Sequence, residues 1–459
     1  MAGSEDKHAK QIAAATNLVK RLANRLNMDA SVRLWDGSRH PLGQKVTSDF
    51  EIKIASPGVI TSILRRPTLD TIIRQYVNKG IDYSGGSLID FGANLNKGNR
   101  SAKLTAMDIA KVIAQLRPFL FASSEPPPEE GAFGGNITGA NRAAGENKEF
   151  IEFHYDLTNA FYELFLDPEM VYSCAYFTDW TNDLTTAQHD KLDMICRKLR
   201  LKPGDRFLDI GCGWGALVAH AAKNYGVTAH GITLSVEQLS HAEEKVRALG
   251  LQDRVTLEFI DYIDLTGTYD KIASVGMYEH IGLDNIPTYM RKIRSLLSED
   301  GLFLNHAISR RAKKRRNLWP DRLRPEQRAL AKYIFPGGAL DDIGNTVQQM
   351  ERAGFEVQDV EAWRLHYART CTLWHDRLIA QKDAAIAIVG EAKYRIYVAY
   401  LAGCAISFNR GTARLYQTLA SKSAKRPPAL PPTRADLYPL PVIGIKNAPV
   451  RTTQFAARR

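Results

Sequence analysis

The sequence has few of the features that mark membrane, secreted or metal-binding proteins. In its 459 residues no run approaches the roughly 20 apolar residues that a transmembrane helix needs. The N-terminal segment MAGSEDKHAK lacks the apolar core of a signal peptide. The five cysteines are odd in number and include no CxxC pair, which argues against a disulfide framework and against a zinc site. We therefore expect a cytoplasmic protein that holds no metal.

Positive charge, in contrast, is in excess, with a net charge of +11 at pH 7. A basic protein attracts polyanions, either nucleic acid or anionic lipid. The densest cluster has six basic residues between positions 310 and 316, and Trp319 follows it. Such a cluster is often only a solvated face, but apolar residues beside it suit a membrane interface. Because no nucleic-acid-binding signature is present, the sequence favours an anionic membrane surface as partner and no nucleic acid.

Composition divides the chain into four parts. Residues 1–122 form a small α+β domain, which includes an amphipathic helix at 10–27. The apolar face of this helix is expected to pack in a core, and contact with a membrane or with a second copy in a homodimer is the alternative. Residues 123–147, rich in proline and glycine, are a linker. Residues 148–420 alternate between strands and helices, and residues 421–459 are a basic, proline-rich tail.

The third part predicts a Rossmann-like α/β fold. Strands are expected at 206–210, 227–232, 255–260, 271–275 and 301–306, with helical segments between them. Strands that alternate with helices form a mainly parallel, doubly wound sheet with helices on both faces. Ligands of such folds bind in the crevice outside the carboxyl ends of the strands.

A glycine-rich turn ends the first of these strands. The segment reads Asp209-Ile210-Gly211-Cys212-Gly213-Trp214-Gly215 and opens the next helix. Closely spaced glycines let the backbone turn sharply and approach a ligand without an intervening Cβ. The spacing is GxGxG rather than the GxGxxG of dinucleotide binders, so no pyrophosphate has to be held. Together with the motifs below, this turn predicts S-adenosylmethionine as cofactor, bound near Asp209, Gly211, Gly213 and Gly215.

The ends of the next two strands supply further candidates for the same crevice. After the second strand, the acid that nucleotide-binding folds place at the ribose is missing. The polar candidates there are Thr233, Ser235 and Gln238. After the third strand come Asp261 and Tyr262, which suit an adenine amino group and its flat face. Each group taken alone is equally consistent with a helix cap or a packed loop.

Six further motifs carry a resemblance to a known family. They are VYSCAYF at 171–177, GMYEHIG at 276–282, NHAI at 305–308, YIFPGG at 333–338, LHYART at 365–370 and SFNRG at 407–411. With the glycine turn, the chain from about Phe153 to Leu419 resembles the cyclopropane-fatty-acyl-phospholipid synthase and mycolic acid cyclopropane synthase family. The N-terminal part resembles, more loosely, the extra domain of the phospholipid-acting branch. The resemblance implies a class I methyltransferase domain and addition of a methylene from S-adenosylmethionine to an unsaturated phospholipid acyl chain. Because such a substrate lies in a bilayer and the chain is basic, we also expect peripheral association with the inner face of the membrane.

The residue types fit the chemistry of that reaction. An alkene has no proton to lose before it attacks the sulfonium methyl, so no general base is needed to start. Alignment and a dry cavity are needed instead, because water would trap the carbocation. The aromatic faces of Tyr278 and Phe335 are candidates for steadying this cation. One proton must then leave the transferred methyl so that the ring can close.

The resemblance also implies a bicarbonate ion for that deprotonation. Its ligands correspond to the side chains of Cys174, Glu279, His306 and Tyr367 and to the backbone of Ile308. Tyr172 and Ser173, which precede Cys174, correspond to cofactor ligands. Cys174 has an alternative role as a small buried residue, and His306 as a hydrogen-bonded core histidine. Glu279 is hardest to explain structurally, since a carboxylate in an apolar site is costly unless it orients a partner.

Three rival functions stay open on the sequence. The same carbocation could yield a methyl-branched or methylene chain instead of a ring. The domain could also be a non-catalytic lipid-binding protein, although the intact glycine turn and Glu279 argue against this. Methylation of nucleic acid would explain the positive charge, but the chain has no NPPY-like motif for a flipped base.

Overall fold

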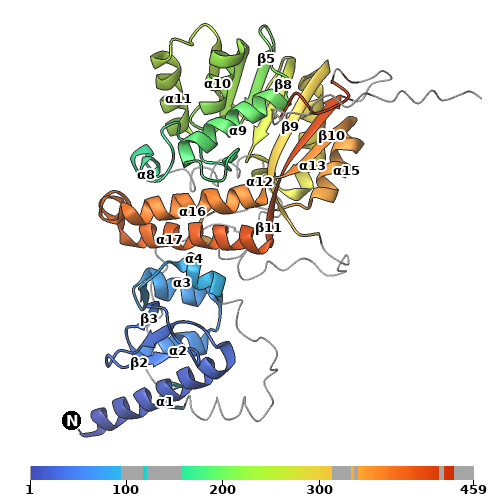
Figure 1. Cartoon of the computed structure of the whole chain (residues 1–459). Coiled ribbons are helices and arrows are strands. Elements are labelled where there is room, and N and C mark those ends of the chain that lie inside the picture. The colour runs from blue at the N-terminus through green and yellow to red at the C-terminus, as the bar shows by residue number, and fades with distance from the viewer. Residues whose placement is uncertain are drawn as a thin grey trace, which may run out of the picture.

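The computed structural model describes residues 2–94, 117–120, 157–312, 332–334, 340–422, 428 and 430–438. Two sheets organise these residues, a small one near the N-terminus and a large one in the second half of the chain (Figure 1). Residues 123–147, residues 313–316, Trp319 and Phe335 lie outside the described residues. No helix in the described part of the chain is long and apolar enough to cross a membrane.

The N-terminal unit is the α+β domain that the sequence predicts. Its elements are α1 (Ala2–Leu26), β1 (Ser31–Arg33), β2 (Arg39–Pro41), β3 (Glu51–Ile54), α2 (Pro57–Arg65), α3 (Leu69–Val77), β4 (Ile81–Ser84), α4 (Leu88–Asn94) and α6 (Arg117–Leu120). The sheet order is β2-β1-β3-β4. The helix expected at 10–27 begins earlier, and its Ala15 and Val19 are buried in the core of the domain, whereas Leu22 is 38% exposed. Core packing is therefore the main use of this apolar face.

The second unit is an α/β domain built on a seven-stranded sheet of order β10-β11-β9-β8-β5-β6-β7. Its strands are β5 (Arg206–Ile210), β6 (Thr228–Thr233), β7 (Val255–Phe259), β8 (Tyr269–Val275), β9 (Leu297–Arg310), β10 (Phe355–Ala362) and β11 (Ala413–Lys422). Strands β5 to β9 are parallel, as predicted, and the Rossmann-like fold is confirmed. The sequence predicts five strands; the sheet adds β10 and β11, and β11 runs antiparallel to both of its neighbours.

Helices cover both faces of this sheet. They are α8 (Asn159–Glu163), α9 (Leu184–Lys198), α10 (Ala216–Tyr225), α11 (Val236–Ala248), α12 (Tyr278–Ile281), the 3-10 helix Leu283–Asn285, α13 (Ile286–Leu296), α15 (Ile343–Arg352), α16 (Arg364–Ala380) and α17 (Lys382–Arg410). Alternate strand residues point to opposite faces, so Phe207 packs with α9 and α10, whereas Leu208 packs with α13. Each face of the sheet thus has its own core.

The helices α16 and α17 lie side by side between the sheet and the N-terminal domain (Figure 1). The buried Arg395 of α17 joins the two units. Its guanidinium lies 4.1 Å from the centre of the Tyr76 ring and donates to the carbonyl oxygens of Tyr76 (2.7 Å) and Ile81 (3.1 Å) and to Asp82 (3.0 Å). Because these backbone acceptors are removed from water, the arginine gives the interface a specific geometry.

Candidate active site

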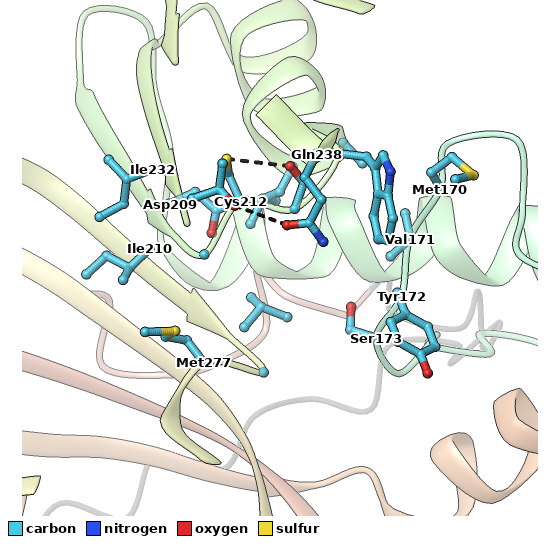
Figure 2. Close-up of a pocket in the computed structure, with 18 of the residues that line it drawn as sticks. Met170, Val171, Tyr172, Ser173, Asp209, Ile210, Cys212, Ile232, Gln238 and Met277 are labelled. Carbon is cyan, nitrogen blue, oxygen red and sulfur yellow. Dashed lines mark hydrogen bonds between the residues drawn. The ribbon is translucent and has the colours of Figure 1, made fainter. Parts of the chain in front are cut away.

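A cleft lies at the carboxyl ends of the central parallel strands, where the fold predicts a ligand. In Figure 2 the segment from Met170 to Ser173 borders it on one side, opposite Ile210, Ile232 and Met277. Eight of the predicted cofactor residues line the cleft: Tyr172, Ser173, Asp209, Gly211, Gly213, Thr233, Gln238 and Tyr262. Gly215, Ser235 and Asp261 are not among its lining residues.

The glycine turn needs glycine mainly for its backbone conformation. Gly211 has a φ of +81° and Gly213 a φ of +55°, values that side chains with a Cβ rarely adopt. The amides of Gly211 and Cys212 both donate to the carbonyl oxygen of Ile232, at 3.0 and 2.9 Å, which ties the turn to β6. Gly215 also has a φ of +81°, and in addition a Cβ there would lie 2.9 Å from the Cβ of Ala242 on α11. It allows α10 to pack closely against α11.

The segment after β6 is held by a small hydrogen-bond network. Ser235 caps α11, and its hydroxyl accepts from the amide of Gln238 at 3.3 Å. The hydroxyl of Thr233 donates to the Gln238 side-chain oxygen at 3.0 Å and accepts from the Ser235 amide at 3.2 Å. Thr233 and Gln238 therefore face the cleft in a fixed arrangement, whereas Ser235 orders the start of the helix.

Two polar residues of α9 hold the segment that carries Tyr172 and Ser173. The fully buried Gln188 donates to the carbonyl oxygens of Val171 (3.2 Å) and Ser173 (2.9 Å). Lys191, only 2% exposed, donates to the Ser173 hydroxyl at 3.0 Å and also lines the cleft. Burial lowers the pKa of Lys191 to about 8, against the attraction of Asp167 and Asp209. The sequence analysis missed Lys191, and its position on the buried side of an amphipathic helix is the signal that could have found it.

Asp209 is the buried carboxyl group of the cleft. Its Oδ1 has no hydrogen-bond partner among the described residues. Burial raises the pKa of Asp209 to about 7, although the nearby Lys191 opposes this rise. S-adenosylmethionine carries positive charge on its sulfonium and amino groups, so a buried carboxylate with a free oxygen is chemically suited to it.

A second set of polar groups begins at α12, next to the cleft. Met277 and His280 line the cleft, and Glu279 lies between them in the sequence. Glu279 Oε1 accepts from the backbone amide of Ile308 at 2.5 Å, while its buried Oε2 lacks a partner in the part of the chain that the structure describes. Burial raises the pKa of Glu279 to about 7, and the bond from Ile308 limits the rise.

His306 lies on the same strand and face as Ile308, two residues away on β9. Its Nδ1 lies 3.1 Å from the side-chain nitrogen of Gln417, and its Nε2 is buried with no described partner. Burial, aided by Lys191 and Lys198, lowers the pKa of His306 well below the usual range. The imidazole is therefore neutral at physiological pH.

Trp363 brings the remaining candidates together. Cys174 Sγ is 3.9 Å from the Trp363 carbonyl oxygen, to which the Tyr367 amide donates at 3.1 Å. The His306 ring meets the Trp363 ring edge-on, with centroids 5.6 Å apart. Burial raises the pKa of the Cys174 thiol and of the Tyr367 phenol well above their usual ranges, so both keep their protons. The sequence analysis also missed Trp363, because a tryptophan outside the family motifs resembles any core residue.

The surroundings of this second set are apolar and aromatic. Cys174 and Tyr367 belong to a core cluster shared with Tyr172, Trp374 and Phe408. The Tyr367 ring stacks on Phe408 with centroids 4.5 Å apart. Tyr278, expected to face the carbocation, packs instead in the core on the opposite face of the sheet and donates to Asp341 at 3.0 Å.

This fold and this cleft define a class I S-adenosylmethionine-dependent methyltransferase. Residues 143–418, more than half of the chain, match the family model described as mycolic acid cyclopropane synthetase. The chain belongs to this family and is an S-adenosylmethionine-dependent methyltransferase.

Individual relatives support the same assignment. A "Probable fatty acid methyltransferase" of Pseudomonas putida is 38% identical over 416 residues, which cover 90% of this chain and 97% of that protein. The cyclopropane-fatty-acyl-phospholipid synthase of Escherichia coli K12 is 38% identical over 291 residues, 63% of this chain and 71% of that protein. The structure of cyclopropane synthase MmaA2 from Mycobacterium tuberculosis superposes with a TM-score of 0.57 at 35% identity, covering 60% of this chain and 98% of that one.

A further solved relative was crystallised with a product of the cofactor. Mycolic acid cyclopropane synthase CmaA1, complexed with S-adenosylhomocysteine and CTAB, is 33% identical with a TM-score of 0.56, over 60% of this chain and 98% of that one.

The raised pKa of Asp209 predicts a pH-dependent affinity for the cofactor. Below about pH 7 the carboxyl group is protonated and cannot attract a cation. We expect the dissociation constant for S-adenosylmethionine to rise up to about tenfold for each pH unit below that value and to level off above it. Calorimetric titrations between pH 5.5 and 8.5 measure this, and Asp209→Asn should bind weakly with a flat profile. The control Glu279→Gln should keep the wild-type slope; an unchanged slope in Asp209→Asn would contradict the assignment.

Proposed function

We propose that the protein is a fatty acid methyltransferase that adds a methylene to a cis double bond of a phospholipid acyl chain and closes a cyclopropane ring. The observation that carries this proposal is two buried atoms, Glu279 Oε2 and His306 Nε2, that have no partner among the described residues. Glu279 lies between the cleft-lining residues Met277 and His280, and the His306 ring meets Trp363 of the aromatic core. A buried polar atom without a partner is costly, so such a pair indicates a polar ligand that is bound during turnover.

The apolar surroundings suit the first step, attack of the alkene on the sulfonium methyl. This step generates a carbocation, which water would capture. Tyr172 lines the cleft and packs against Trp374, with ring centroids 5.2 Å apart, and Tyr367 meets Trp374 at 6.0 Å. These rings exclude water, and their faces can steady a cation without reacting with it.

Ring closure requires loss of a proton from the transferred methyl, and the residues present suit a bicarbonate ion for that role. The protonated Cys174 and Tyr367 can donate hydrogen bonds to its oxygens, and Glu279 Oε2 can accept one from its hydroxyl. A bound bicarbonate would supply a general base that the side chains lack, since the buried His306 and Glu279 are already committed to orienting partners. These residues would thus hold and orient the ion.

A methyl-branching reaction on an unsaturated acyl chain is the second candidate. It is favoured by the Pseudomonas putida relative, which covers more of this chain than the Escherichia coli synthase and is named as a fatty acid methyltransferase. The two reactions share the carbocation. A ring forms when the transferred methyl loses a proton and closes on the cation, a methylene branch forms when a hydride shifts along the chain before that proton is lost, and an unsaturated methyl branch forms when the acyl chain loses the proton.

The product distinguishes these two candidates. Incubation with vesicles of cis-unsaturated phospholipid, bicarbonate and trideuteromethyl S-adenosylmethionine should yield acyl chains that carry a CD₂ group. The chains should resist mild hydrogenation and show cyclopropane proton signals by NMR, because the ring contains no double bond. A product that takes up hydrogen, or that retains all three deuterons, would instead establish methylene or methyl branching.

Glu279 is predicted to act on turnover rather than on cofactor binding. Glu279→Gln preserves volume but removes the charge that orients the second polar set, so kcat should fall by about a hundredfold or more. The dissociation constant for S-adenosylmethionine should change little. Glu243→Gln, on the exposed side of α11, is a matched control that should keep full activity. Loss of cofactor affinity with intact kcat would place Glu279 in the cofactor site.

We also propose that the protein docks on the cytoplasmic face of anionic membranes without spanning them. An acyl substrate resides in a bilayer, so the active site has to be held at its surface. Arg310 at the end of β9 is paired with Asp342 at 3.1 Å, which leaves Arg311, the basic residues 313–316 and Trp319 as the candidate contacts. Each basic residue near an anionic surface contributes about 1 kcal/mol.

Binding to phosphatidylglycerol vesicles should therefore weaken strongly with salt, because the Debye length shrinks to about 3 Å at 1 M. Replacing Lys313, Lys314, Arg315 and Arg316 with Gln should reduce vesicle binding in co-sedimentation to a similar extent.

A control variant with four exposed basic residues of other regions changed, Lys20, Lys45, Lys53 and Arg247, has the same net charge. It should keep most of the binding. Equal, salt-independent binding to neutral vesicles would show that apolar insertion dominates instead.

A further inference from the structure

A row of three polar residues crosses the sheet beside the candidate active site. His306 on β9 is the Cα partner of Gln417 on β11, and Gln417 is the partner of Glu361 on β10. Directly paired residues of neighbouring strands point to the same face. The proposed function assigns a role to His306 and none to the two other residues of the row.

The side chain of Lys198, the last residue of α9, contacts this row of residues. Its side chain is 1% exposed, and its ammonium contacts the Glu361 carboxylate and lies 2.8 Å from Gln417 Oε1. The ammonium also lies 5.2 Å from the centre of the Trp363 ring. Burial lowers the pKa of Lys198, but the adjacent Glu361 carboxylate opposes this and favours the charged form.

The chemistry of the ammonium fixes the orientation of the Gln417 amide. A lysine ammonium donates hydrogen bonds and accepts none, so the atom of Gln417 that faces it must be the oxygen. The amide nitrogen then faces His306 Nδ1, at 3.1 Å. An amide nitrogen also only donates, so Nδ1 must be the acceptor of this bond. This assignment follows from the donors and acceptors themselves, without any hydrogen being observed.

A neutral imidazole carries a hydrogen on only one of its two ring nitrogens. With Nδ1 as acceptor, that hydrogen is on Nε2, the buried ring atom that has no partner among the described residues. The opposite tautomer would place two donors against each other at Nδ1 and leave a lone pair on Nε2. A lone pair would repel an anion, whereas an N–H attracts it.

We propose that Gln417 is a positioning residue that holds His306 in the Nε2–H tautomer, with Lys198 and Glu361 fixing the Gln417 amide. His306 thereby presents a hydrogen-bond donor to an anionic ligand of the active site. The tautomer follows from contacts alone, and only the identity of the anion as bicarbonate rests on the proposed function.

The tautomer can be read directly by ¹⁵N NMR of the full-length protein labelled at histidine, with His306→Gln used to assign the signal. The wild-type protein should show protonated Nε2 and unprotonated Nδ1 at His306. Gln417→Glu keeps the shape but provides an acceptor opposite Nδ1, so the hydrogen should move to Nδ1. In this variant kcat should fall by at least about tenfold, while the dissociation constant for S-adenosylmethionine stays within about twofold.

Gln358→Glu is the matched control. Gln358 lies on β10, outside the row, and donates to the Ser421 hydroxyl at 2.9 Å. It should leave the tautomer and kcat unchanged. Lys198→Met removes the group that orients the amide, so it should give a mixture of the two tautomers and an intermediate kcat.

A wild-type His306 protonated on Nδ1 would overturn the proposal, and this result needs no variant of Gln417 to fold. So would a loss of activity in Gln417→Glu with the tautomer unchanged, or a changed tautomer with full activity. Failure of the proposed function would give a different result. Gln417→Glu would still shift the tautomer and lower kcat, but the wild-type product would contain no ring, or turnover would not depend on added bicarbonate.

Discussion

The pairing of β11 with β9 is the interaction on which the active site depends. Strand β9 continues to Arg310, and β11 pairs with it from Ala413 to Ser421. This antiparallel pairing brings the end of the family region back into the sheet beside His306. It also positions the preceding helices, so that Trp363 and Tyr367 reach the segment that contains Cys174. Without this strand, the glycine turn would still form a cleft, but His306 would lose Gln417, and Trp363 would lose its backbone hydrogen bond to Leu415.

The cleft and the second polar set each bury a carboxyl group, Asp209 and Glu279, and they stabilise it in different ways. In the cofactor cleft, buried Asp209 and Lys191 lie near enough to influence each other, so each partly offsets the desolvation of the other. In the second set, Glu279 has no countercharge among the described residues and accepts a hydrogen bond from the backbone amide of Ile308. Burial raises its pKa, and its Oε2 has no partner in the described part of the chain, which leaves it available for a ligand. The first arrangement suits a cationic cofactor, and the second suits an orienting role in a dry cavity.

The N-terminal domain is attached to the helices that complete the active site. Arg395 of α17 binds backbone carbonyls of the small domain, and α17 packs on α16, which carries Tyr367. The family model begins at residue 143, yet the Pseudomonas putida relative aligns over 90% of this chain. The small domain is thus shared with a relative of nearly full length, and its contact with α17 connects it to the helix pair α16 and α17.

The sequence by itself predicted most of the polar residues that line the cleft. The glycine turn, the five parallel strands and the polar residues after β6 are local patterns, because a strand, a tight turn and a helix start are each specified by neighbouring residues. The resemblance to the family extended the prediction to Cys174, Glu279 and His306, which lie in three different motifs far apart in the sequence. Tertiary structure decided the rest. No local sequence pattern predicts that β11 pairs antiparallel with β9. Tyr278 and Glu279 are adjacent in the sequence, but Tyr278 packs in the core on the opposite face of the sheet, whereas Glu279 accepts a hydrogen bond from Ile308. Lys191, Trp363 and Gln417 gained their roles only through burial and long-range contact, since a lysine, a tryptophan or a glutamine acquires a specific partner only when distant strands and helices place one against it.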